Sequence, residues 1–395
     1  MSTPPATTRT GATFAPPIPA ARRWLEGVEF PPDRPLINVS QAAPVAPPPR
    51  AMREEMARLV CDDPNVHLYG AVLGLPALRA EVAAQFSQAY GGQIDASQVG
   101  ITSGCNEAFA AVMSCLTDQN AEVLVPVPWY FNHKMWLDMA GVRVVPLPCG
   151  ADLLPDLAAA RALITPATRA IVMVTPNNPT GVEYPPALMA GFAALAREAG
   201  IYLVVDETYR DFHSQTGAPH GLFQHDHWPD HLVQLYSFSK AYRLTGHRVG
   251  AVVAGAGLLG EIEKFLDTVT ICPTPLGQQA ALWGMQHLHS WLAAERTEVL
   301  ARRAAIEQGF TPLAQRGWKL LGCGAYFAYV EHPFDSDAET LGQRLVREAG
   351  ILALPATMFT PTGDTAGQRQ LRIAFANIDC KTIAQMFDRL CAFQG

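Results

Sequence analysis

The sequence predicts an α/β fold, with a large domain built on a mainly parallel central sheet flanked by helices and a smaller α+β domain. The chain has 395 residues, of which 49% are apolar and 16% charged, so it can form two or three domains with sizeable cores. Short β-branched runs alternate with helix-like segments along most of the chain, which is typical of α/β proteins. From about residue 285 longer helical stretches replace this alternation. We therefore expect an arm and part of the small domain in residues 1–50, the large domain in 51–284 and the small domain in 285–395.

The first 24 residues are rich in proline, threonine and alanine and lack the apolar core of a secretory signal. We expect them to form an arm that is disordered or becomes ordered on assembly. The longest apolar stretch, residues 249–260, is too short and too rich in glycine to cross a membrane. A formal net charge of -7 without a basic run argues against nucleic-acid partners, and eight scattered cysteines without a CxxC pair indicate reduced thiols. These features predict a soluble, cytoplasmic protein that acts on small metabolites.

The expected strands are short β-branched runs bounded by turn residues, which fits strands buried on both faces of a sheet. They lie at 121–128, 169–176, 201–207, 232–239 and 248–255 in the large domain, and at 326–332 and 369–376 in the small domain. Helices are expected at 106–116 and at 185–200, the second of which begins with proline and ends with glycine. Ligands of such sheets bind beyond the carboxyl ends of the strands. Polar residues that follow these strands are therefore the first candidates for a site.

Three segments place polar groups at such strand ends. Asp206 directly follows the apolar run IYLVV, where a carboxylate needs a cation or donor, although a simple capping role explains it equally well. TPNNPTG, residues 175–181, is by itself an ordinary turn. SGCNEA, residues 103–108, opens a helix whose unpaired N–H groups could hold a phosphate or simply be capped. Together they favour one shared site.

Lys240 lies in SFSKAYRLTGHRVG, residues 237–250, preceded by two serines and followed by Arg248. The motifs SGCNEA, PVPWYFNH, TPNNPTG, DETYRDF, SFSKAYRLTGHRVG and RIAFA, in this order, resemble those of the class I and II aminotransferases. The resemblance extends from about Tyr69 to the C-terminus. It implies a pyridoxal 5'-phosphate-dependent transferase of fold type I that moves an amino group from an L-amino acid to a 2-oxo acid.

The resemblance also implies roles for the motif residues. Lys240 would form an aldimine with the cofactor and move protons at the substrate α-carbon, which requires the lowered pKa of a desolvated lysine beside cations. Asp206, supported by His133, would keep the pyridine nitrogen protonated. Hydrogen bonds to the ring oxygen and packing against the ring would come from Asn178, Tyr209 and Tyr130.

The remaining implied contacts concern the phosphate, the substrate and a second subunit. The residues that would bind the cofactor phosphate are Gly104, Cys105, Ser237, Ser239 and Arg248. Arg372 would bind the substrate α-carboxylate through its planar fork, with Asn178 and Tyr130 beside the substrate. Tyr69 would reach the cofactor phosphate of a neighbouring subunit, which implies a homodimer with shared active sites.

Three departures from the family pattern bear on the substrate. Arg243 stands where many members have glycine, and QAAPVAPPP, residues 41–49, replaces a glycine-containing substrate segment. Residues 268–275 lack the arginine that dicarboxylate-specific members have near this point. Because a buried second carboxylate needs a cation, we expect neutral donors, aromatic or aliphatic, unless Arg243, Arg22 or Arg23 supplies one.

Other interpretations of the sequence are weaker or cannot be separated. The same cofactor apparatus would serve a C–S β-lyase, a decarboxylase or an oxidase acting on an amino acid. GAGLLG, residues 255–260, fits the GxGxxG pattern of nicotinamide-dependent enzymes but lacks the acidic residue expected about 20 positions later. HDHWPDH, residues 225–231, has no matching ligand cluster, so we expect no metal site. A transcription regulator with this fold would need a DNA-binding module, and residues 1–50 show no helix-turn-helix pattern.

Overall fold

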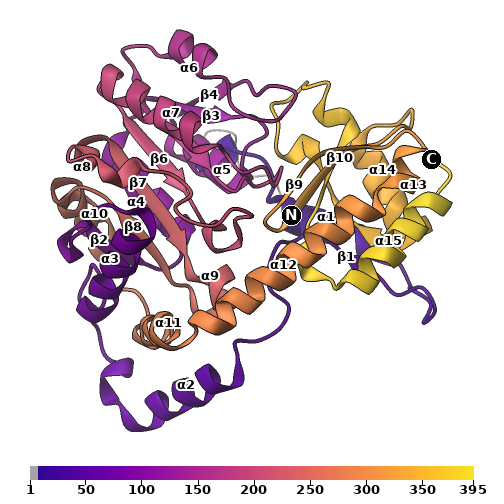
Figure 1. Cartoon of the computed structure of the whole chain (residues 1–395). Coiled ribbons are helices and arrows are strands. Elements are labelled where there is room, and N and C mark those ends of the chain that lie inside the picture. Colours follow the sequence, from indigo (N-terminus) through magenta and orange to yellow (C-terminus); the bar gives the residue numbers. More distant parts are fainter. Residues whose placement is uncertain (1–7) are drawn as a thin grey trace.

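The computed structural model describes residues 8–395 (Figure 1). We use "large domain" for the unit around a seven-stranded sheet and "small domain" for the unit around a four-stranded sheet. The helix α12 (His289–Gly309) runs from one to the other (Figure 1). The predicted α/β fold is confirmed, and its central sheet, which was expected to be mainly parallel, is a mixed sheet flanked by helices.

The large sheet contains all five strands that were predicted for it, together with β2 and β4. Its order is β2 (Val99–Thr102), β8 (Gly250–Val253), β7 (Leu232–Ser237), β6 (Tyr202–Asp206), β5 (Thr168–Val174), β3 (Glu122–Pro126) and β4 (Arg143–Leu147). Neighbouring strands are parallel except that β8 runs antiparallel to both β2 and β7. The sheet therefore directs the carboxyl ends of β3, β5, β6 and β7 toward one edge.

Apolar side chains cover both faces of this sheet, as the β-branched runs predict. Along β6, Leu203 and Val205 pack into one core while Val204 packs into the other, because successive side chains of a strand point to opposite faces. The helices that contribute to the first core include α3 (Pro76–Tyr90), α7 (Pro186–Ala199) and α11 (Pro275–His287). Those of the second core include α4 (Cys105–Leu116) and α10 (Ala256–Val269).

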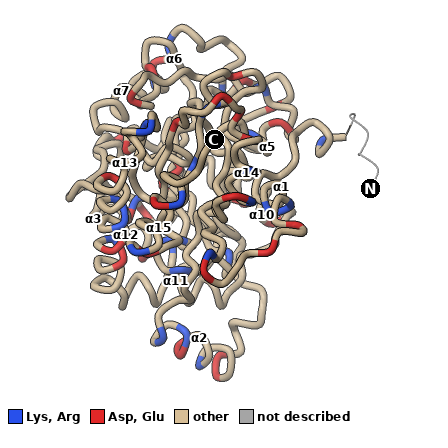
Figure 2. Tube along the Cα trace, turned by 90° about the vertical axis from the view of Figure 1, so that its right-hand side faces the viewer, with Lys and Arg blue, Asp and Glu red and all other residues tan. Residues whose placement is uncertain are grey.

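The remaining helices of the large domain are peripheral or short. They are α2 (Arg50–Asp62), which packs against α11, and α5 (Phe131–Ala140), α6 (Leu157–Leu163), α8 (Trp228–His231) and α9 (Phe238–Ala241). Basic and acidic residues are interspersed along the chain trace (Figure 2). Within residues 8–395, no helix has the length and apolar character needed to cross a membrane.

The small domain combines C-terminal elements with a strand from the N-terminal segment. Its antiparallel sheet has the order β12 (Leu354–Pro355), β13 (Gln370–Ile373), β10 (Phe327–Glu331) and β9 (Lys319–Gly324). The helices α12, α13 (Thr311–Ala314), α14 (Ala338–Arg344) and α15 (Cys380–Ala392) accompany it. β1 (Ile37–Asn38) pairs in parallel with β11 (Ile351–Leu352), so the residues after β1 lie beside the small domain.

The N-terminal arm differs from our expectation of a disordered or assembly-dependent segment. Within its described part, α1 (Pro17–Arg22) is a helix that begins with proline, which favours a helix start. Ala21 is fully buried and packs in one core with Phe131, Leu352 and Phe359. The arm is thus folded because α1 presents an apolar face that both domains cover. Residues 1–7, part of the same expectation, lie outside the described residues.

Candidate active site

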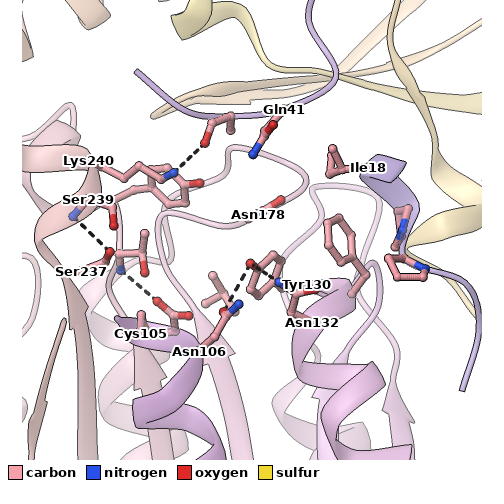
Figure 3. Close-up of a pocket in the computed structure, with 18 of the residues that line it drawn as sticks. Ile18, Gln41, Cys105, Asn106, Tyr130, Asn132, Asn178, Ser237, Ser239 and Lys240 are labelled. Carbon is pink, nitrogen blue, oxygen red and sulfur yellow. Dashed lines mark hydrogen bonds between the residues drawn. The ribbon is translucent and has the colours of Figure 1, made fainter. Parts of the chain in front are cut away.

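A cavity of about 350 Å³ lies at the carboxyl ends of strands of the large sheet, and residues of the arm such as Ile18 also line it (Figure 3). Arg372 of β13 lines it as well. The predicted site residues that line it are Cys105, Tyr130, Asn178, Asp206, Tyr209, Ser237, Ser239, Lys240, Arg248 and Arg372. Asp206 ends β6, Ser237 ends β7, and Asn178 follows β5. The strand ends thus bring together motifs that are far apart in the sequence, as expected for an open α/β sheet.

Lys240 carries an amine that is held inside this cavity. It lies on α9, and its Nζ donates a hydrogen bond of 2.7 Å to the backbone oxygen of Ala42. Burial lowers the pKa of Lys240 to about 8, with a further contribution from the positive charges of Arg248 and Arg372. A large fraction of this lysine is therefore neutral near pH 8, and a neutral amine can act as a nucleophile or a base.

Asp206 is a buried carboxylate with an exposure of 3%. Its Oδ1 accepts a hydrogen bond of 2.9 Å from the backbone N–H of Thr208, and its Oδ2 lies 3.2 Å from His133 Nε2. The His133 ring in turn stacks on Phe109, with 3.9 Å between ring centroids. Although burial raises the pKa of Asp206, the contacts with His133 and Thr208 outweigh it, and the net pKa is lowered. The site therefore holds a fixed negative charge at the end of β6.

The start of α4 and Arg248 form the cationic end of the cavity. Gly104 precedes α4 with φ of 92°, and a side chain there would collide with the Arg248 guanidinium. Gly104 has no side chain to cap the first turn of α4, and the N–H groups of Glu107 and Ala108 donate to the Gly104 oxygen. The N–H groups of Cys105 and Asn106 are left available among the described residues. Arg248 Nη1 donates a hydrogen bond of 3.4 Å to Ser239 Oγ. The Ser239 N–H donates one of 3.3 Å to Ser237 Oγ. Open N–H groups, hydroxyls and a guanidinium together suit a phosphate dianion.

Arg372 brings a second cation to the cavity from β13. Its guanidinium is buried between the rings of Phe327 and Phe359, at 5.1 and 4.8 Å from their centroids. Nη1 donates to Asn178 Oδ1 at 3.0 Å, Nη2 donates to the Ser40 backbone oxygen, and Nε has no partner among the described residues. Burial lowers the pKa of Arg372 to about 10. A buried guanidinium that no carboxylate within residues 8–395 neutralises is suited to bind an external carboxylate.

Two tyrosines contribute neutral hydroxyls to the same cavity. Burial raises the pKa of Tyr130 to about 12 and that of Tyr209 well above its ordinary value, so both keep their protons. The Tyr130 hydroxyl accepts a hydrogen bond of 2.9 Å from Asn132 Nδ2 (Figure 3). Tyr209 packs edge-on against Phe327, one of the two rings that enclose Arg372.

Two predicted site residues, Gly104 and Tyr69, do not line the cavity, and Tyr69 lies on the surface of the single chain. Tyr69 is 81% exposed. Its sequence neighbour Leu68 is also exposed, as are Val269 at the end of α10 and Ile271 just after it. The Gly70 N–H donates to Cys272 Sγ at 3.3 Å, which places the two loops side by side. Exposed aromatic and aliphatic side chains of this kind are typical of a surface that another molecule covers.

Sequence reasoning did not name the other residues that line the cavity. They are Pro16, Pro17, Ile18, Pro19, Gln41, Ala42, Asn106, Phe131, Asn132, Val174 and Thr208. The only signal for them was indirect, since two lie in PVPWYFNH and the rest come mainly from proline-rich segments or a helix start. The rival motifs contribute nothing to this cavity: GAGLLG forms the start of α10, and HDHWPDH forms α8 with its preceding turn. Among the residues that the structure describes, no cluster of His, Cys, Asp or Glu could hold a metal ion.

Residues 34–390 match the family described as aminotransferase class I and II. The chain is 28% identical to an aromatic aminotransferase of Arabidopsis thaliana, over 84% of this chain and 82% of the relative. It is 29% identical to a valine–pyruvate aminotransferase of Mycobacterium tuberculosis, over 86% of this chain and 87% of the relative. An Escherichia coli protein with a methionine aminotransferase function has the same fold, with a TM-score of 0.87, 24% identity and coverage of 98% and 99% of the two chains. Given this match over most of its length, the chain is an aminotransferase of the class I and II family.

Proposed function

We propose that this aminotransferase uses pyridoxal 5'-phosphate and takes its amino group from a neutral L-amino acid, aromatic or aliphatic. The observation that carries this proposal is the convergence of Lys240, Asp206 and Arg372 on one cavity. An amine that is partly buried, a buried carboxylate and a buried guanidinium correspond to the three groups that amino-acid chemistry on this cofactor requires. The eight cysteines are all free thiols, which supports a cytoplasmic location.

The cavity offers a matching group for each part of the cofactor. Arg248 and the uncapped start of α4 suit its phosphate, and the Asp206 carboxylate suits its ring nitrogen. The Lys240 amine suits its aldehyde. When bound, pyridoxal phosphate supplies an electron sink for the electron pair that is released at the substrate α-carbon.

The chain's own residues then divide the remaining work. The Lys240 amine would hold the cofactor and would move the proton of the substrate α-carbon. Asp206, backed by His133, holds a proton on the ring nitrogen. Because Asn178 Oδ1 accepts from Arg372, its amide nitrogen is left to donate to the ring oxygen, together with the Tyr209 hydroxyl.

The substrate side of the cavity supports a neutral donor. Ile18 and Phe131 line it together with the arm prolines, and they offer an apolar surface to the substrate side chain. Arg22 does not line the cavity, and its Nη2 donates to Gln41 Oε1 at 2.7 Å. Arg243 is also outside the lining and is paired with Glu295. Arg22, Arg23 and Arg243, the cations that could receive a second carboxylate, are therefore all absent from the cavity lining.

We further propose that the active enzyme is a homodimer in which Tyr69 reaches the cofactor phosphate of the partner subunit. The support is the exposed position of Tyr69 beside an apolar surface loop. Inactive Tyr69→Ala and Lys240→Ala subunits should restore activity when they are mixed, because each mixed dimer regains one intact site. No recovery after demonstrated subunit exchange would contradict shared sites.

A panel of amino donors tests the proposed substrate class. Single-turnover absorbance changes of the cofactor should be fastest with phenylalanine, leucine or methionine and slower with aspartate and glutamate. Product analysis should find a 2-oxo acid and an aminated acceptor. Ammonia without an aminated acceptor would instead indicate lyase or oxidase chemistry, carbon dioxide would indicate a decarboxylase, and equal or faster reaction of aspartate would overturn the neutral preference.

A further inference from the structure

Arg243 lies three residues after Lys240 and has an unusual backbone conformation. Its φ of 55° falls in the left-handed region, where a residue with a side chain is strained and glycine is not. Such strain persists only where the surroundings enforce it, and it often marks a functional position. The contacts of the Arg243 side chain therefore need an explanation.

The Arg243 guanidinium forms a bidentate ion pair with Glu295 of α12. Nη2 lies 2.7 Å from each carboxylate oxygen and Nε lies 3.0 Å from Oε2, while both side chains are less than a quarter exposed, at 23% and 22%. The guanidinium also lies over the Trp291 ring, 5.4 Å from its centroid. Its third group, Nη1, donates to the backbone oxygen of Pro47 at 3.4 Å. Arg243 thus connects its own loop, which follows α9, with the helix α12 and with the segment after β1.

Residues 40–47, which we call the strap, form part of the cavity wall through Gln41 and Ala42. Three basic side chains hold its backbone oxygens: Arg372 at Ser40, Lys240 at Ala42 and Arg243 at Pro47. Asn377 adds contacts to the Gln41 oxygen and, at 3.1 Å, to the Ala43 N–H. In the proposed function Lys240 also binds the cofactor and Arg372 also binds the substrate. Arg243 binds neither of them.

We propose that Arg243 is a positioning residue that holds the strap over the substrate side of the site and thereby sets substrate affinity. The inference rests on the proposed function and concerns the same cavity. Arg243 does not line the cavity, and its guanidinium is already paired with Glu295. Arg243 therefore acts by holding the strap and not by touching the substrate. Loss of the ion pair between Arg243 and Glu295, which we call the clasp, should weaken substrate binding. It should leave Lys240 and the residues that would bind the phosphate intact.

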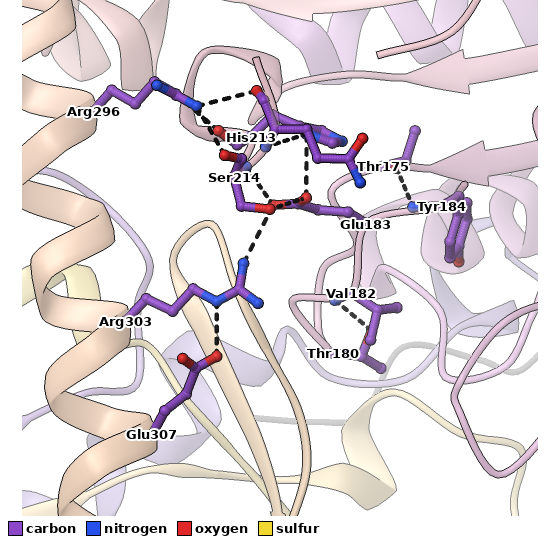
Figure 4. Close-up of polar contacts among 11 residues, drawn as sticks. Thr175, Thr180, Val182, Glu183, Tyr184, His213, Ser214, Arg296, Arg303 and Glu307 are labelled. Atoms are coloured by element: carbon purple, nitrogen blue, oxygen red, sulfur yellow. Dashed lines mark hydrogen bonds and ion pairs between the residues drawn. The ribbon is translucent and has the colours of Figure 1, made fainter. Parts of the chain in front are cut away.

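A second junction keeps α12 in place without Arg243 (Figure 4). Arg296 donates to the backbone oxygens of His213, Ser214 and Gln215 at 2.8, 3.1 and 3.1 Å. Arg303 lies 3.6 Å from Glu183, which also accepts from Ser214. Because these contacts are independent of the clasp, variants at Arg243 or Glu295 should still fold with α12 docked.

The test compares Arg243→Gly, Arg243→Lys and Glu295→Gln with Glu298→Gln as the matched control. Glu298 lies on the same helix and pairs with Arg302 one turn away, so it controls for the loss of a glutamate charge from α12. KM for the best donor should rise about fivefold to tenfold in Arg243→Gly and Glu295→Gln, with kcat and pyridoxal phosphate affinity changed less than about twofold. Arg243→Lys should fall between Arg243→Gly and the parent, because lysine keeps the charge but not the fork.

Binding of an unreactive ligand separates this inference from the proposed function. The dissociation constant of 3-phenylpropanoate, a carboxylate without an amino group, should rise by a similar factor and does not depend on turnover. If Arg243→Gly behaves like Glu298→Gln, or if kcat and cofactor affinity fall together, the positioning role is wrong. A selective loss of aspartate and glutamate as donors would instead make Arg243 a substrate contact and overturn it. Should Arg243→Gly fail to fold, Glu295→Gln gives the same decision.

Discussion

The two sides of the active-site cavity are built in different ways. The side where we propose that the cofactor binds, called the cofactor side, consists of strand ends of one sheet, where Asp206 and Ser237 terminate neighbouring parallel strands. The substrate side is assembled from the arm, the strap and β13, so that Arg372 contacts Ser40 across 332 positions of sequence. Backbone hydrogen bonds of a single sheet fix the first side. The second side joins separate segments through side-chain contacts together with the pairing of β1 and β11. We therefore expect changes on the cofactor side to lower kcat and changes on the substrate side to raise KM.

Lys240→Ala is the sharpest test of the cofactor side. Turnover should fall at least about 1,000-fold, because the variant loses both the amine that binds the cofactor and the base that moves the proton. Borohydride reduction followed by peptide mapping should label Lys240 in the parent protein. The control is Lys264→Ala, an exposed lysine of α10. A label on any other lysine would remove Lys240 from this role.

Asp206→Ala should have the next largest effect. Turnover should fall about 100-fold or more, and pyridoxal phosphate should bind more weakly, because the ring nitrogen loses the anion that keeps it protonated. Cofactor titration and kcat measurements report the two effects separately. Near-normal turnover would show that Asp206 only caps the backbone at Thr208.

Arg372→Lys tests the substrate side with the charge retained. KM for every donor should rise about tenfold to a hundredfold, because lysine cannot offer two parallel N–H groups to the α-carboxylate. Cofactor affinity should change little. An equal loss of cofactor affinity would mean that the two sides of the cavity are not separable at this residue.

The pH dependence of cofactor binding connects the two sides through Lys240. The pKa of about 8 predicts that the rate of covalent cofactor capture rises with pH, with its midpoint near pH 8, and levels off above it as the amine loses its proton. Arg372→Met removes a positive charge that lowers this pKa, so the midpoint should move to higher pH. Stopped-flow absorbance across a pH series measures the midpoint. An unchanged midpoint would show that Arg372 does not contribute and that burial and Arg248 lower the pKa of Lys240.

Ile18→Ala should produce the smallest change. KM for leucine or phenylalanine should rise about threefold to tenfold, because the substrate side chain loses apolar surface to contact. Cofactor affinity and KM for alanine should stay near the parent values, which makes alanine the internal control. An equal change for alanine would indicate that the arm acts through the fold of the site and not through side-chain contact.

Much of the cofactor side could be predicted from the sequence, for a physical reason. Strands buried on both faces need continuous β-branched runs, and the polar residue that follows such a run lies at the sheet edge. The positions of β3, β5, β6 and β7 and the strand-end placement of Asp206, Asn178 and Lys240 follow from this local rule. The motif order then identified the family. Periodicity carries no information about strand direction, so the antiparallel orientation of β8 was not predictable in this way.

The substrate side was decided by the tertiary structure, because its contacts join segments that no local pattern links. The arm folds as α1 only where Phe131, Leu352 and Phe359 supply its apolar partners, and a proline-rich stretch read alone resembles a disordered tail. The strap reaches the cavity because β1 pairs with β11. Arg243 was recognisable as an unusual residue from its place after Lys240, but its partner, Glu295, lies 52 positions away on another helix. Local propensity determines elements and motifs, whereas long-range packing determines which of them meet.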